Sequence, residues 1–523
     1  MQPKSEGTFY ITTPIYYVNS VPHIGHAYTT IAADVLARYK RLAGYQVFFL
    51  TGTDEHGQKV EKAAQERGVD PKTHCDEMVK RFQSLWQRLN ISNNDFIRTT
   101  ETRHKTVVQR ILKDLYDCGD IYQDSYEGWY CIPCERFWTE KDLTEGKCPD
   151  CLRSVIEISE KNYFFRMSKY QSWLIEHVER NERFILPLSR RNEILGFLRT
   201  PLEDLCISRP KKRLEWGIEI PFDTDYVTYV WFDALINYIS GIGFGSENSQ
   251  FSRFWPEAIH LIGKDILTTH TVYWPTMLRA VGLTPPKMFF AHGWWTIEGK
   301  KMSKSLQNVV EPNRLIDTYG ADAVRYFLMR EVPFGLDGDF SHSAMVHRIN
   351  SDLANDLGNL FSRTLSMVVK YFDGRIPNPS LPQEIDRDLE VVSGKVFPQL
   401  SKQMDDLAFS RALASIWEIV NAGNKYIDQT APWALAKEEK DRPRLGMVLY
   451  QTLESLRLIA LLLAAFMPST AEKMWSQLGM EENFWEQSLT ENGKWGRLKP
   501  GRRVTKPSSL FPRIDLSKGS QGV

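Results

Sequence analysis

The chain has 523 residues, of which 42% are hydrophobic and 25% are charged, and its 65 basic and 65 acidic residues cancel. This composition is typical of a soluble globular protein, and the length excludes a single core, so we expect two or three domains. The balanced charge excludes attraction of a nucleic acid by the overall field, so such a partner would need local basic patches.

The first predicted elements are a strand within residues 8–19, a helix within 27–44 and a second strand within 45–57. A strand, helix, strand unit of this kind implies a parallel sheet. Similar strands return in residues 258–267 and 287–295, and the interval between the two halves contains paired cysteines and irregular charged segments. The sequence therefore predicts an α/β domain with a parallel sheet that is split by an insertion.

From about residue 350 the pattern changes to long amphipathic helices, which predict a helical bundle. Residues 494–523 are rich in Pro, Gly, Ser and basic side chains, and we expect a loosely packed tail there. The apolar repeat at intervals of three and four is formed by Leu353, Leu357, Leu360, Phe361, Thr364, Leu365 and Val368.

The N-terminus lacks the basic segment and apolar run of a secretory signal. The longest apolar run, residues 458–467, is too short to span a bilayer. We therefore expect a cytoplasmic protein without a membrane partner.

Two histidines, His23 and His26, stand with Gly25 where the first strand turns into the first helix. Ligands of open parallel sheets bind at the carboxyl ends of strands and against helix N-termini, which have partial positive charge. Imidazoles there can donate hydrogen bonds to phosphate oxygens, and Gly25 lets a purine approach the backbone closely. The alternative is structural: one histidine caps the helix and the other packs.

A basic loop that follows a glycine carries the sequence KMSKS at residues 301–305. Alone, such a loop is typical of solvated surface. Together with the HIGH tetrapeptide of residues 23–26, it resembles the paired signature of the class I aminoacyl-tRNA synthetases. The resemblance implies a Rossmann-like catalytic domain in which Lys301, Ser303 and Lys304 contact ATP.

Amino-acid activation explains these residue types. The substrate carboxylate attacks the α-phosphate of ATP in line, so the enzyme must position reactants and stabilise charge rather than supply a covalent nucleophile. Lysines on a movable loop can close over the triphosphate and open for pyrophosphate to leave. The resemblance implies Mg²⁺ that accompanies ATP, a ribose site at Gly263 and Asp265, and catalytic roles for His23, His26, Lys301 and Lys304.

The resemblance is narrower than the class. Five segments resemble, in order, those of bacterial methionyl-tRNA synthetases, and the similarity extends to about residue 510. The segments are residues 13–26, 51–57, 229–238, 262–278 and 291–305. We therefore expect a methionine–tRNA ligase that forms methionyl-adenylate and transfers methionine to the terminal ribose of methionine tRNA, for initiation and elongation of translation.

The resemblance also implies a methionine pocket, in which Asp54 binds the α-ammonium group. A thioether packs favourably against aromatic rings, and a slot for an unbranched chain excludes β-branched substrates. Leu235 departs from the family, whose members often have proline there. For Trp231 and Tyr17 the alternative is an ordinary core aromatic. The residues that match the side-chain pocket are Ile15, Tyr17, Trp231, Ala234, Leu235, Tyr238, Ile266 and His270.

Four cysteines form two Cys-x-x-Cys pairs, Cys131 with Cys134 and Cys148 with Cys151, which are separated by thirteen residues. Four thiolates at this spacing suit one tetrahedral zinc ion, and a closed four-sulfur site is structural because it leaves no position for water. The remaining cysteines, Cys75, Cys118 and Cys206, are expected to be plain thiols.

Within the helical region, Asn359 and Arg363 lie four residues apart on one predicted helix face, and Trp433 follows a proline near a later helix start. Amide and guanidinium groups can read base edges, and an exposed indole can stack on an unpaired base. Without the resemblance each would be a surface polar residue or a core tryptophan. The resemblance implies that these three residues read the anticodon.

The expected division follows from these patterns. The catalytic domain comprises residues 1–118 and 225–295, with the insertion at 119–224 and its zinc knuckle at 131–151. Residues 296–350 hold the KMSKS loop and a stem-contact region, 351–505 the helical anticodon-binding domain and 506–523 the tail. We expect a monomer. Two alternatives stay open: a class I ligase for leucine, isoleucine, valine or cysteine, and a tRNA-binding protein without catalysis.

Overall fold

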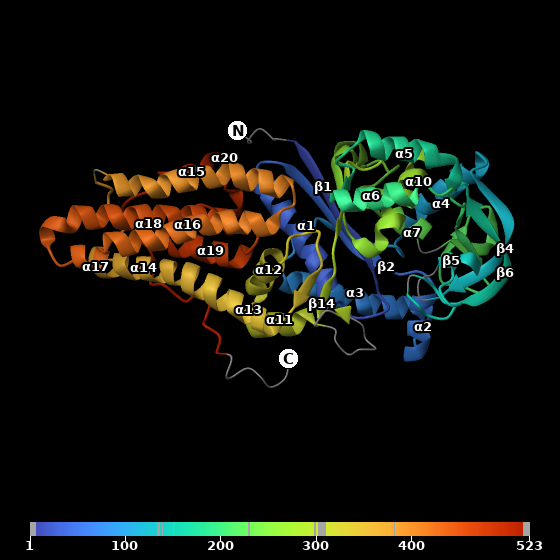
Figure 1. Ribbon diagram of the computed structural model, residues 1–523, viewed down its shortest axis with the longest axis horizontal. Helices are drawn as coiled ribbons and strands as arrows, with labels where there is room; N and C mark the ends of the chain where they lie inside the picture. Colours follow the sequence, from blue (N-terminus) through green and yellow to red (C-terminus); the bar gives the residue numbers. More distant parts are fainter. Residues whose placement is uncertain are drawn as a thin grey trace.

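The computed structural model describes residues 7–132, 136–138, 140–149, 151–228, 231–297, 300–301, 310–380 and 382–515. The molecule is elongated (Figure 1). A bundle of helices forms one end, a helix-covered parallel sheet lies in the middle, and an antiparallel sheet that contains β4 (Ile121–Cys131) and β6 (Ile156–Phe165) lies at the other end.

The central sheet has six strands within the described residues, and every neighbouring pair is parallel. The two halves of the chain join where β1 pairs with β12, with Tyr10 opposite Ala258. This confirms the predicted parallel sheet split by an insertion. In spatial order the strands are β3 (Asp95–Arg98), β2 (Gln46–Asp54), β1 (Thr8–Tyr17), β12 (Ala258–Gly263), β13 (Met288–His292) and β7 (Ile185–Leu186).

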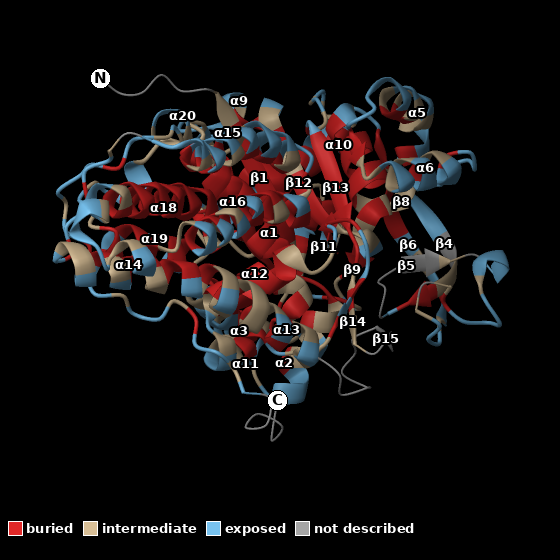
Figure 2. Cartoon of the chain, turned by 60° about the vertical axis from the view of Figure 1, so that its left-hand side comes forward, coloured by how far each residue is buried: buried red, intermediate tan, exposed pale blue. Residues whose placement is uncertain are grey.

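Strand β1 is buried on both faces, as a central parallel strand must be. Phe9 and Ile11 pack into one hydrophobic cluster with α1 (Ile24–Leu42) and α3 (Pro71–Arg88). Tyr10 points to the opposite face, into a second cluster with α4 (Thr102–Asp117) and α10 (Trp274–Ala280). Figure 2 shows β1, β12 and β13 as buried between these layers. Because all the strands of this sheet are parallel, their carboxyl ends lie at the same edge of the sheet.

In the described part of the insertion, four strands form a sheet in the order β5-β4-β6-β8, with β5 at Arg136–Trp138 and β8 at Leu205–Cys206. β4 and β6 pair antiparallel from Ile121 with Phe165 to Tyr130 with Ile156. A smaller sheet has the order β10-β11-β9, with β9 at Ser208–Pro210, β10 at Ile218–Ile220 and β11 at Asp223–Thr228.

Part of the insertion returns to the central sheet. β7 has two residues, and its Ile185 and Leu186 pair with Phe289 and Phe290 of β13. The helices α5 (Gln171–Arg180) and α6 (Leu188–Phe197) flank it. Two residues give no periodic signal, so the sequence could not place this strand.

A connecting region joins the sheet to the helices. It contains β14 (Trp295–Ile297), which pairs with β15 (Lys300–Lys301) and β16 (Gly338–Phe340). It also contains α11 (Pro312–Tyr319) and α12 (Ala321–Arg330). The fully buried Arg325 of α12 pairs with Asp34 of α1 at 2.7 Å, and its guanidinium donates to the carbonyl oxygens of Leu89, Ala465 and Phe466. One side chain thus links the sheet domain to the helical bundle.

The helical bundle is built around α18 (Arg442–Leu463), which packs against α14, α15, α16 and α19. Of the described helices, only Glu439–Leu463 is long and apolar enough to cross a membrane by length and composition, and its apolar window is 100% buried. It is the core helix of the bundle. The other bundle elements are α13 (His342–Arg348), a π-helix at Ile349–Gly358, α14 (Asn359–Phe372), α15 (Glu384–Asp405), α16 (Phe409–Thr430), α17 (Pro432–Leu435), α19 (Pro468–Gln477) and α20 (Leu489–Asn492).

The expectation of a loosely packed C-terminal tail is wrong at three positions between residues 498 and 514, although most of the other residues in this range are exposed. Leu498, Val504 and Phe511 are buried against the bundle. The side chain of Asn350 exchanges two hydrogen bonds with the backbone of Ile514, at 2.9 and 2.8 Å. Apolar residues this widely spaced show no period in the sequence, so their burial depends on tertiary contacts. Residues 516–523 lie outside the described residues.

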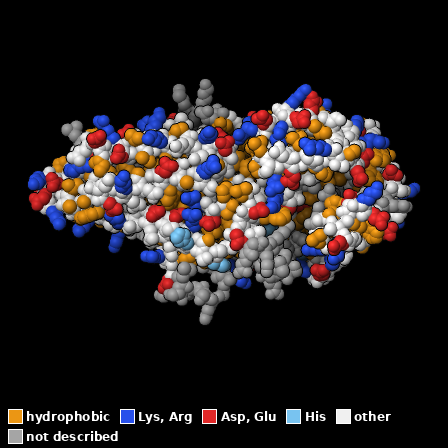
Figure 3. All heavy atoms as spheres, in the orientation of Figure 1, with side chains coloured by type: hydrophobic (Ala, Val, Ile, Leu, Met, Phe, Trp, Pro, Cys, Tyr) orange, Lys and Arg blue, Asp and Glu red, His pale blue; other side chains and the backbone are white. Residues whose placement is uncertain are grey.

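The surface agrees with the balanced composition. On the face drawn in Figure 3, Lys and Arg side chains are interspersed with Asp and Glu side chains over both ends of the molecule. Attraction of a polyanion must therefore depend on local groups rather than on the overall field.

Candidate active site

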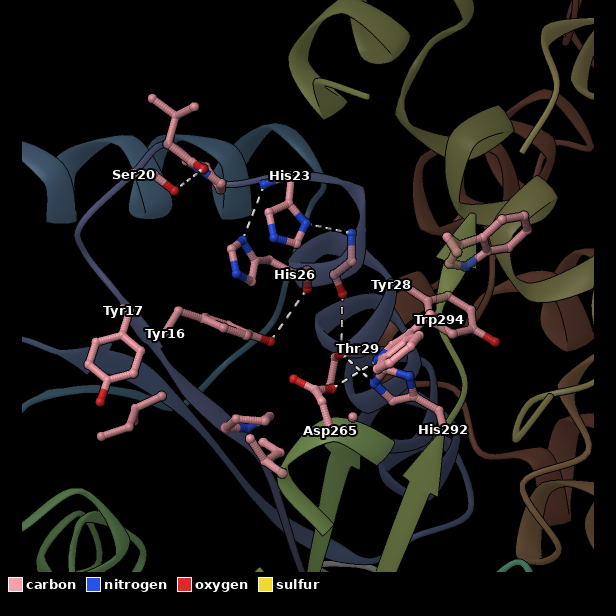
Figure 4. Close-up of a pocket in the computed structure, with 18 of the residues that line it drawn as sticks. Tyr16, Tyr17, Ser20, His23, His26, Tyr28, Thr29, Asp265, His292 and Trp294 are labelled. Carbon is pink, nitrogen blue, oxygen red and sulfur yellow. Dashed lines mark hydrogen bonds between the residues drawn. The ribbon is translucent and has the colours of Figure 1, made fainter. Parts of the chain in front are cut away.

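A cavity of about 610 Å³ opens at the carboxyl edge of the sheet, where β1, β12 and β13 end and α1 begins (Figure 4). This is the position at which open α/β sheets bind ligands. Eight of the residues that the sequence predicts for ATP or methionine line it: Ile15, Tyr17, His23, Gly25, His26, Gly263, Asp265 and Ile266.

His23 and His26 cap helix α1 with their ring nitrogens. Nδ1 of His23 accepts a hydrogen bond from the N–H of Gly25 at 3.1 Å, and Nδ1 of His26 accepts from the N–H of His23 at 3.2 Å. A ring that accepts at Nδ1 carries its proton at Nε2 when neutral. Burial, and secondarily the neighbouring His23, holds the pKa of His26 well below its usual range. His26 is therefore a neutral ring that can donate at Nε2.

Glycines allow two of the lining side chains to fold back on the backbone. A Cβ on Gly25 would lie 3.0 Å from Cε1 of His23, and a Cβ on Gly263 would lie 2.5 Å from Oδ1 of Asp265. The Asp265 carboxylate also accepts a hydrogen bond from Nε1 of Trp294 at 3.1 Å. Gly263 and Asp265 therefore form one unit at the end of β12.

His292 and Thr29 line the cavity and were missed by the sequence prediction. Nδ1 of His292 lies 2.7 Å from the carbonyl oxygen of Gly293, and its Nε2 lies 2.6 Å from Oγ1 of Thr29. Burial lowers the pKa of His292, so this ring is also neutral. The available signal was a histidine at the carboxyl end of a predicted strand.

The remaining residues predicted for the methionine side chain are not among the residues that line the cavity, and they connect to it through Ile15 and Ile266, which are. Ile15, Ile266 and Trp231 pack against the hydrophobic cluster that includes Leu235 and Tyr238. Trp231 and His270 approach each other edge to face with ring centres 6.2 Å apart. Ala234 is buried in the short helix α7 (Trp231–Leu235), which also carries Trp231 and Leu235. The structure thus brings these predicted residues together, and their role stays a prediction.

Tyr238 and His270 form an uncharged hydrogen-bonded pair in this cluster. Nδ1 of His270 lies 2.9 Å from the carbonyl oxygen of Ile266, which makes it the donor, so Nε2 accepts from the Tyr238 hydroxyl at 2.8 Å. Burial lowers the pKa of His270 to about 4. Burial likewise raises the pKa of Tyr238 above its ordinary value. Both side chains are therefore neutral at physiological pH, which suits an apolar ligand group.

Asp54 ends β2 directly beside β1. It is 4% exposed and is paired in the parallel ladder with Tyr17, which lines the cavity. The placement agrees with a carboxylate at the cavity edge, and ammonium binding stays a prediction.

The KMSKS segment lies largely outside the described residues. The backbone of Lys301 pairs with Thr296 of β14, whereas Ser303 and Lys304 are not described. Trp295, the first residue of β14, lines the cavity. The segment therefore begins in β15, which pairs with the strand β14 that starts at the cavity wall.

Three of the four predicted zinc ligands come together in the insertion. The sulfur atoms of Cys131, Cys148 and Cys151 lie within 4.8 Å of one another, and those of Cys131 and Cys151 are 3.5 Å apart. Cys134 lies outside the described residues. Three clustered thiols fit a zinc ion in their donor chemistry. Of the other cysteines, Cys75 is buried, Cys118 is exposed and Cys206 is intermediate.

The predicted anticodon residues meet on the helical bundle. The guanidinium of Arg363 lies 5.7 Å from the centre of the Trp433 ring and pairs with Asp428 at 3.2 Å. Trp433 is 45% exposed. Asn359, one helical turn before Arg363 in α14, is exposed. An exposed amide, an exposed indole and a partly buried guanidinium thus share one region of the helical bundle.

The comparisons with known proteins agree with this geometry. The family model described as tRNA synthetases class I (M) matches residues 9–158 and 153–365. The model described as the anticodon binding domain of methionyl tRNA ligase matches residues 376–520. A parallel sheet with a cavity at its HIGH turn, followed by a helical bundle, defines the protein as a class I tRNA synthetase.

Similar proteins narrow the class. Methionine--tRNA ligase of Caldanaerobacter subterraneus subsp. tengcongensis is 54% identical over 512 residues, which cover 98% of this chain and 80% of the relative. The enzyme of Thermotoga maritima is 49% identical over 511 residues, which cover 97% of this chain and 80% of the relative. The chain belongs to the methionine–tRNA ligase family.

Solved structures of methionyl-tRNA synthetases have the same overall fold as this chain. The structure of Mycobacterium tuberculosis methionyl-tRNA synthetase in complex with methionyl-adenylate superposes with a TM-score of 0.93 at 43% identity, and the match covers 97% of this chain and 100% of that chain. The apo form of the same enzyme superposes with a TM-score of 0.87 at 40% identity, with coverage of 98% and 100%.

Proposed function

We propose that the chain activates L-methionine with ATP and then transfers the methionyl group to the 3′-terminal ribose of methionine tRNA. The observation that carries the proposal is the cavity of about 610 Å³, which places the two histidines of α1, the Gly263–Asp265 unit and the apolar Ile15 in one space. Family membership supplies the reaction class, and the methionyl-adenylate complex of a 43% identical relative supports the activation step.

In the activation step, the α-phosphate lies at the N-terminus of α1. A methionine carboxylate oxygen attacks the α-phosphorus, a P–O bond forms, and the bond to pyrophosphate breaks. No proton is transferred, so the protein must stabilise charge on the phosphate oxygens. His26 donates at Nε2 as a neutral ring, and the positive end of the α1 dipole acts in the same direction. His23 has the same role, and Lys301 and Lys304 neutralise the triphosphate, whose Mg²⁺ arrives with ATP.

The rest of the adenylate is held by the end of β12. The Asp265 carboxylate accepts hydrogen bonds from ribose hydroxyls, and the missing side chain at Gly263 leaves room for that carboxylate. Asp54 binds the methionine ammonium group. Ile15, Tyr17 and the neutral cluster around Tyr238 and His270 take the thioether side chain.

In the transfer step, a terminal ribose hydroxyl of the tRNA attacks the methionyl carbonyl, an ester C–O bond forms, the C–O bond to the phosphate of AMP breaks, and the hydroxyl proton leaves with AMP. Asn359, Arg363 and Trp433 read the anticodon at the far end of the molecule. The indole of Trp433 stacks on an unpaired base, and the amide and guanidinium read base edges.

Cys131, Cys148 and Cys151, together with Cys134, would hold one zinc ion. A bound zinc ion would cross-link a short, polar part of the insertion. It would take no part in the reaction. The proposed division assigns residues 1–118 and 225–295 to catalysis, 119–224 to the insertion and 351–505 to anticodon binding. We also propose that the protein is a monomer and is located in the cytoplasm. Light scattering of the purified protein tests the oligomeric state.

Methionine-dependent exchange of labelled pyrophosphate into ATP tests the activation step. We expect exchange with methionine and charging of methionine tRNA. Exchange with leucine or cysteine but not with methionine would show another class I ligase. Binding of tRNA without exchange by any amino acid would show a protein that only binds tRNA.

A further inference from the structure

Asp54 is the last residue of β2, and the loop that follows it is held by its first two residues, Glu55 and His56. Glu55 is fully buried, and its carboxylate accepts hydrogen bonds from Thr53 at 2.7 Å and from Nε and Nη2 of Arg98 at 2.7 and 2.9 Å. The hydroxyl of Thr100 donates to the same carboxylate at 2.5 Å. This side of the loop is therefore attached to β3 and the segment that follows it.

His56 attaches the other side of the loop to a distant part of the chain. Nδ1 of His56 donates to Oδ2 of Asp233 at 2.7 Å, and the two side chains are 1% and 0% exposed. The second carboxylate oxygen of Asp233 lies 3.4 Å from Nε2 of the fully buried His104. Nδ1 of His104 in turn lies 2.8 Å from Oγ of Ser240. Asp233 thus stands between two imidazoles in the core.

Asp233 belongs to the helix that carries the side-chain half of the proposed methionine site. In α7 it is followed by Ala234 and Leu235 and preceded, two positions earlier, by Trp231. His56 lies two residues after Asp54, a separation of about 7 Å of chain. The hydrogen bond between His56 and Asp233 therefore joins the ammonium half to the thioether half across 177 positions of sequence.

A carboxylate at this depth is costly unless it is paired. Burial by itself would raise the pKa of Asp233, but the neighbouring His56 and His104 hold it below its usual value, so the group is ionised. Ionised groups in a core are no better for stability than apolar residues of similar volume. A hydrogen bond with fixed donor and acceptor does, however, set the distance and orientation of the two elements that it joins.

We propose that His56 and Asp233 are positioning residues that fix the distance between Asp54 and helix α7, so that the ammonium and thioether groups of methionine bind together. His104 lies on the other side of Asp233, with its Nε2 3.4 Å from the second carboxylate oxygen. The inference rests on the proposed function and adds two residues that need not contact the substrate. Displacement of Asp54 by even about 1 Å is enough to weaken a positioned contact strongly.

Steady-state pyrophosphate exchange separates positioning from folding. His56→Ala should raise the KM for methionine about tenfold to a hundredfold, with little change in the KM for ATP. His56→Asn keeps a donor near the position of Nδ1, so we expect it to restore most of the methionine KM. Asp233→Asn, which can still accept from His56 but loses its charge, should fall between the two.

Asp386→Asn is a matched control, because Asp386 is also a fully buried carboxylate, held by Arg444 and Tyr426 in the helical bundle. It should lower the thermal midpoint while both KM values stay unchanged. If His56→Ala only reduces kcat, or raises both KM values equally, the two residues are merely structural and the inference is overturned. If wild-type protein shows no methionine-dependent exchange, the proposed function and this inference fail together. Wild-type exchange with an unchanged methionine KM in His56→Ala overturns the inference alone.

Discussion

His23 and His26 stack at the start of α1 with ring centres 3.8 Å apart, and together they form the capping box of the helix. The sequence left two interpretations open, helix capping or phosphate binding. The geometry makes them compatible for His26, since Nδ1 caps the helix and the proton stays on Nε2. The same ring can therefore stabilise the helix and donate to a phosphate oxygen.

Two substitutions at His26 separate these roles. Asparagine places an acceptor near Nδ1 but has no donor near Nε2, whereas glutamine places a donor near Nε2 and has no acceptor near Nδ1. We expect His26→Asn to keep its thermal midpoint and lose about 10²- to 10³-fold in pyrophosphate exchange. His26→Gln should keep more activity and lose about 0.5–2 kcal/mol of stability. Equal activity in the two variants would contradict the donor role.

Trp433 and Arg363 should matter for tRNA and not for activation. Trp433→Ala is expected to leave methionine-dependent exchange nearly intact and to reduce tRNA charging severely, because stacking on a base contributes about 1–3 kcal/mol. Trp485→Ala is the control, since that indole is also partly exposed, at 38%. Equal losses of exchange and charging in Trp433→Ala would refute the anticodon role.

The clustered cysteines predict a metal content that can be measured. Elemental analysis of the purified protein should find one zinc per chain, and Cys148→Ser should lose it and make the insertion sensitive to protease. Removal of one thiolate leaves too few ligands for a closed tetrahedral site. Cys118→Ser, at an exposed thiol, should keep the metal. Full zinc content in Cys148→Ser would place the ion elsewhere.

Arg325 should be a large contributor to stability. Its guanidinium is fully buried and pairs with Asp34 while donating to three carbonyl oxygens. Lysine cannot satisfy all four acceptors, so Arg325→Lys should lower the free energy of unfolding by about 3–5 kcal/mol, the usual cost of breaking a buried ion pair. Denaturant unfolding measures the change. A loss below about 1 kcal/mol would mean that the pair behaves like one on the surface.

Glu482 should contribute a stabilisation that depends on pH. Hydrogen bonds from Arg502 lower the pKa of Glu482 from 4.5 to about 2 in the folded protein. Because the folded pKa is the lower one, the contribution is full above about pH 4.5 and is lost as the pH falls toward 2. The carboxylate is 37% exposed, so the contribution at neutral pH is about 0.5–1 kcal/mol after screening.

Comparison of wild type with Glu482→Gln tests this directly. The difference in free energy of unfolding should be largest near neutral pH and shrink as the pH is lowered. A difference that is constant with pH would assign the effect to packing rather than to charge.

The sequence predicted the parallel sheet, its insertion, the helical bundle and the family, because these depend on local signals. Hydrophobic periodicity marks a strand or a helix within a few residues, and motifs such as residues 23–26 lie on one turn. The cysteine pairs are equally local. Each of these features could be predicted without knowledge of which segments meet.

Only the tertiary structure decided which distant side chains meet. The contacts between His56 and Asp233, between Thr29 and His292, and between Asp34 and Arg325 join residues 177, 263 and 291 positions apart along the chain. The burial of Phe511 in the C-terminal segment also depends on contacts with residues distant in the sequence. No local pattern encodes such contacts, since they form only when the folded chain closes long loops and packs its elements in one arrangement.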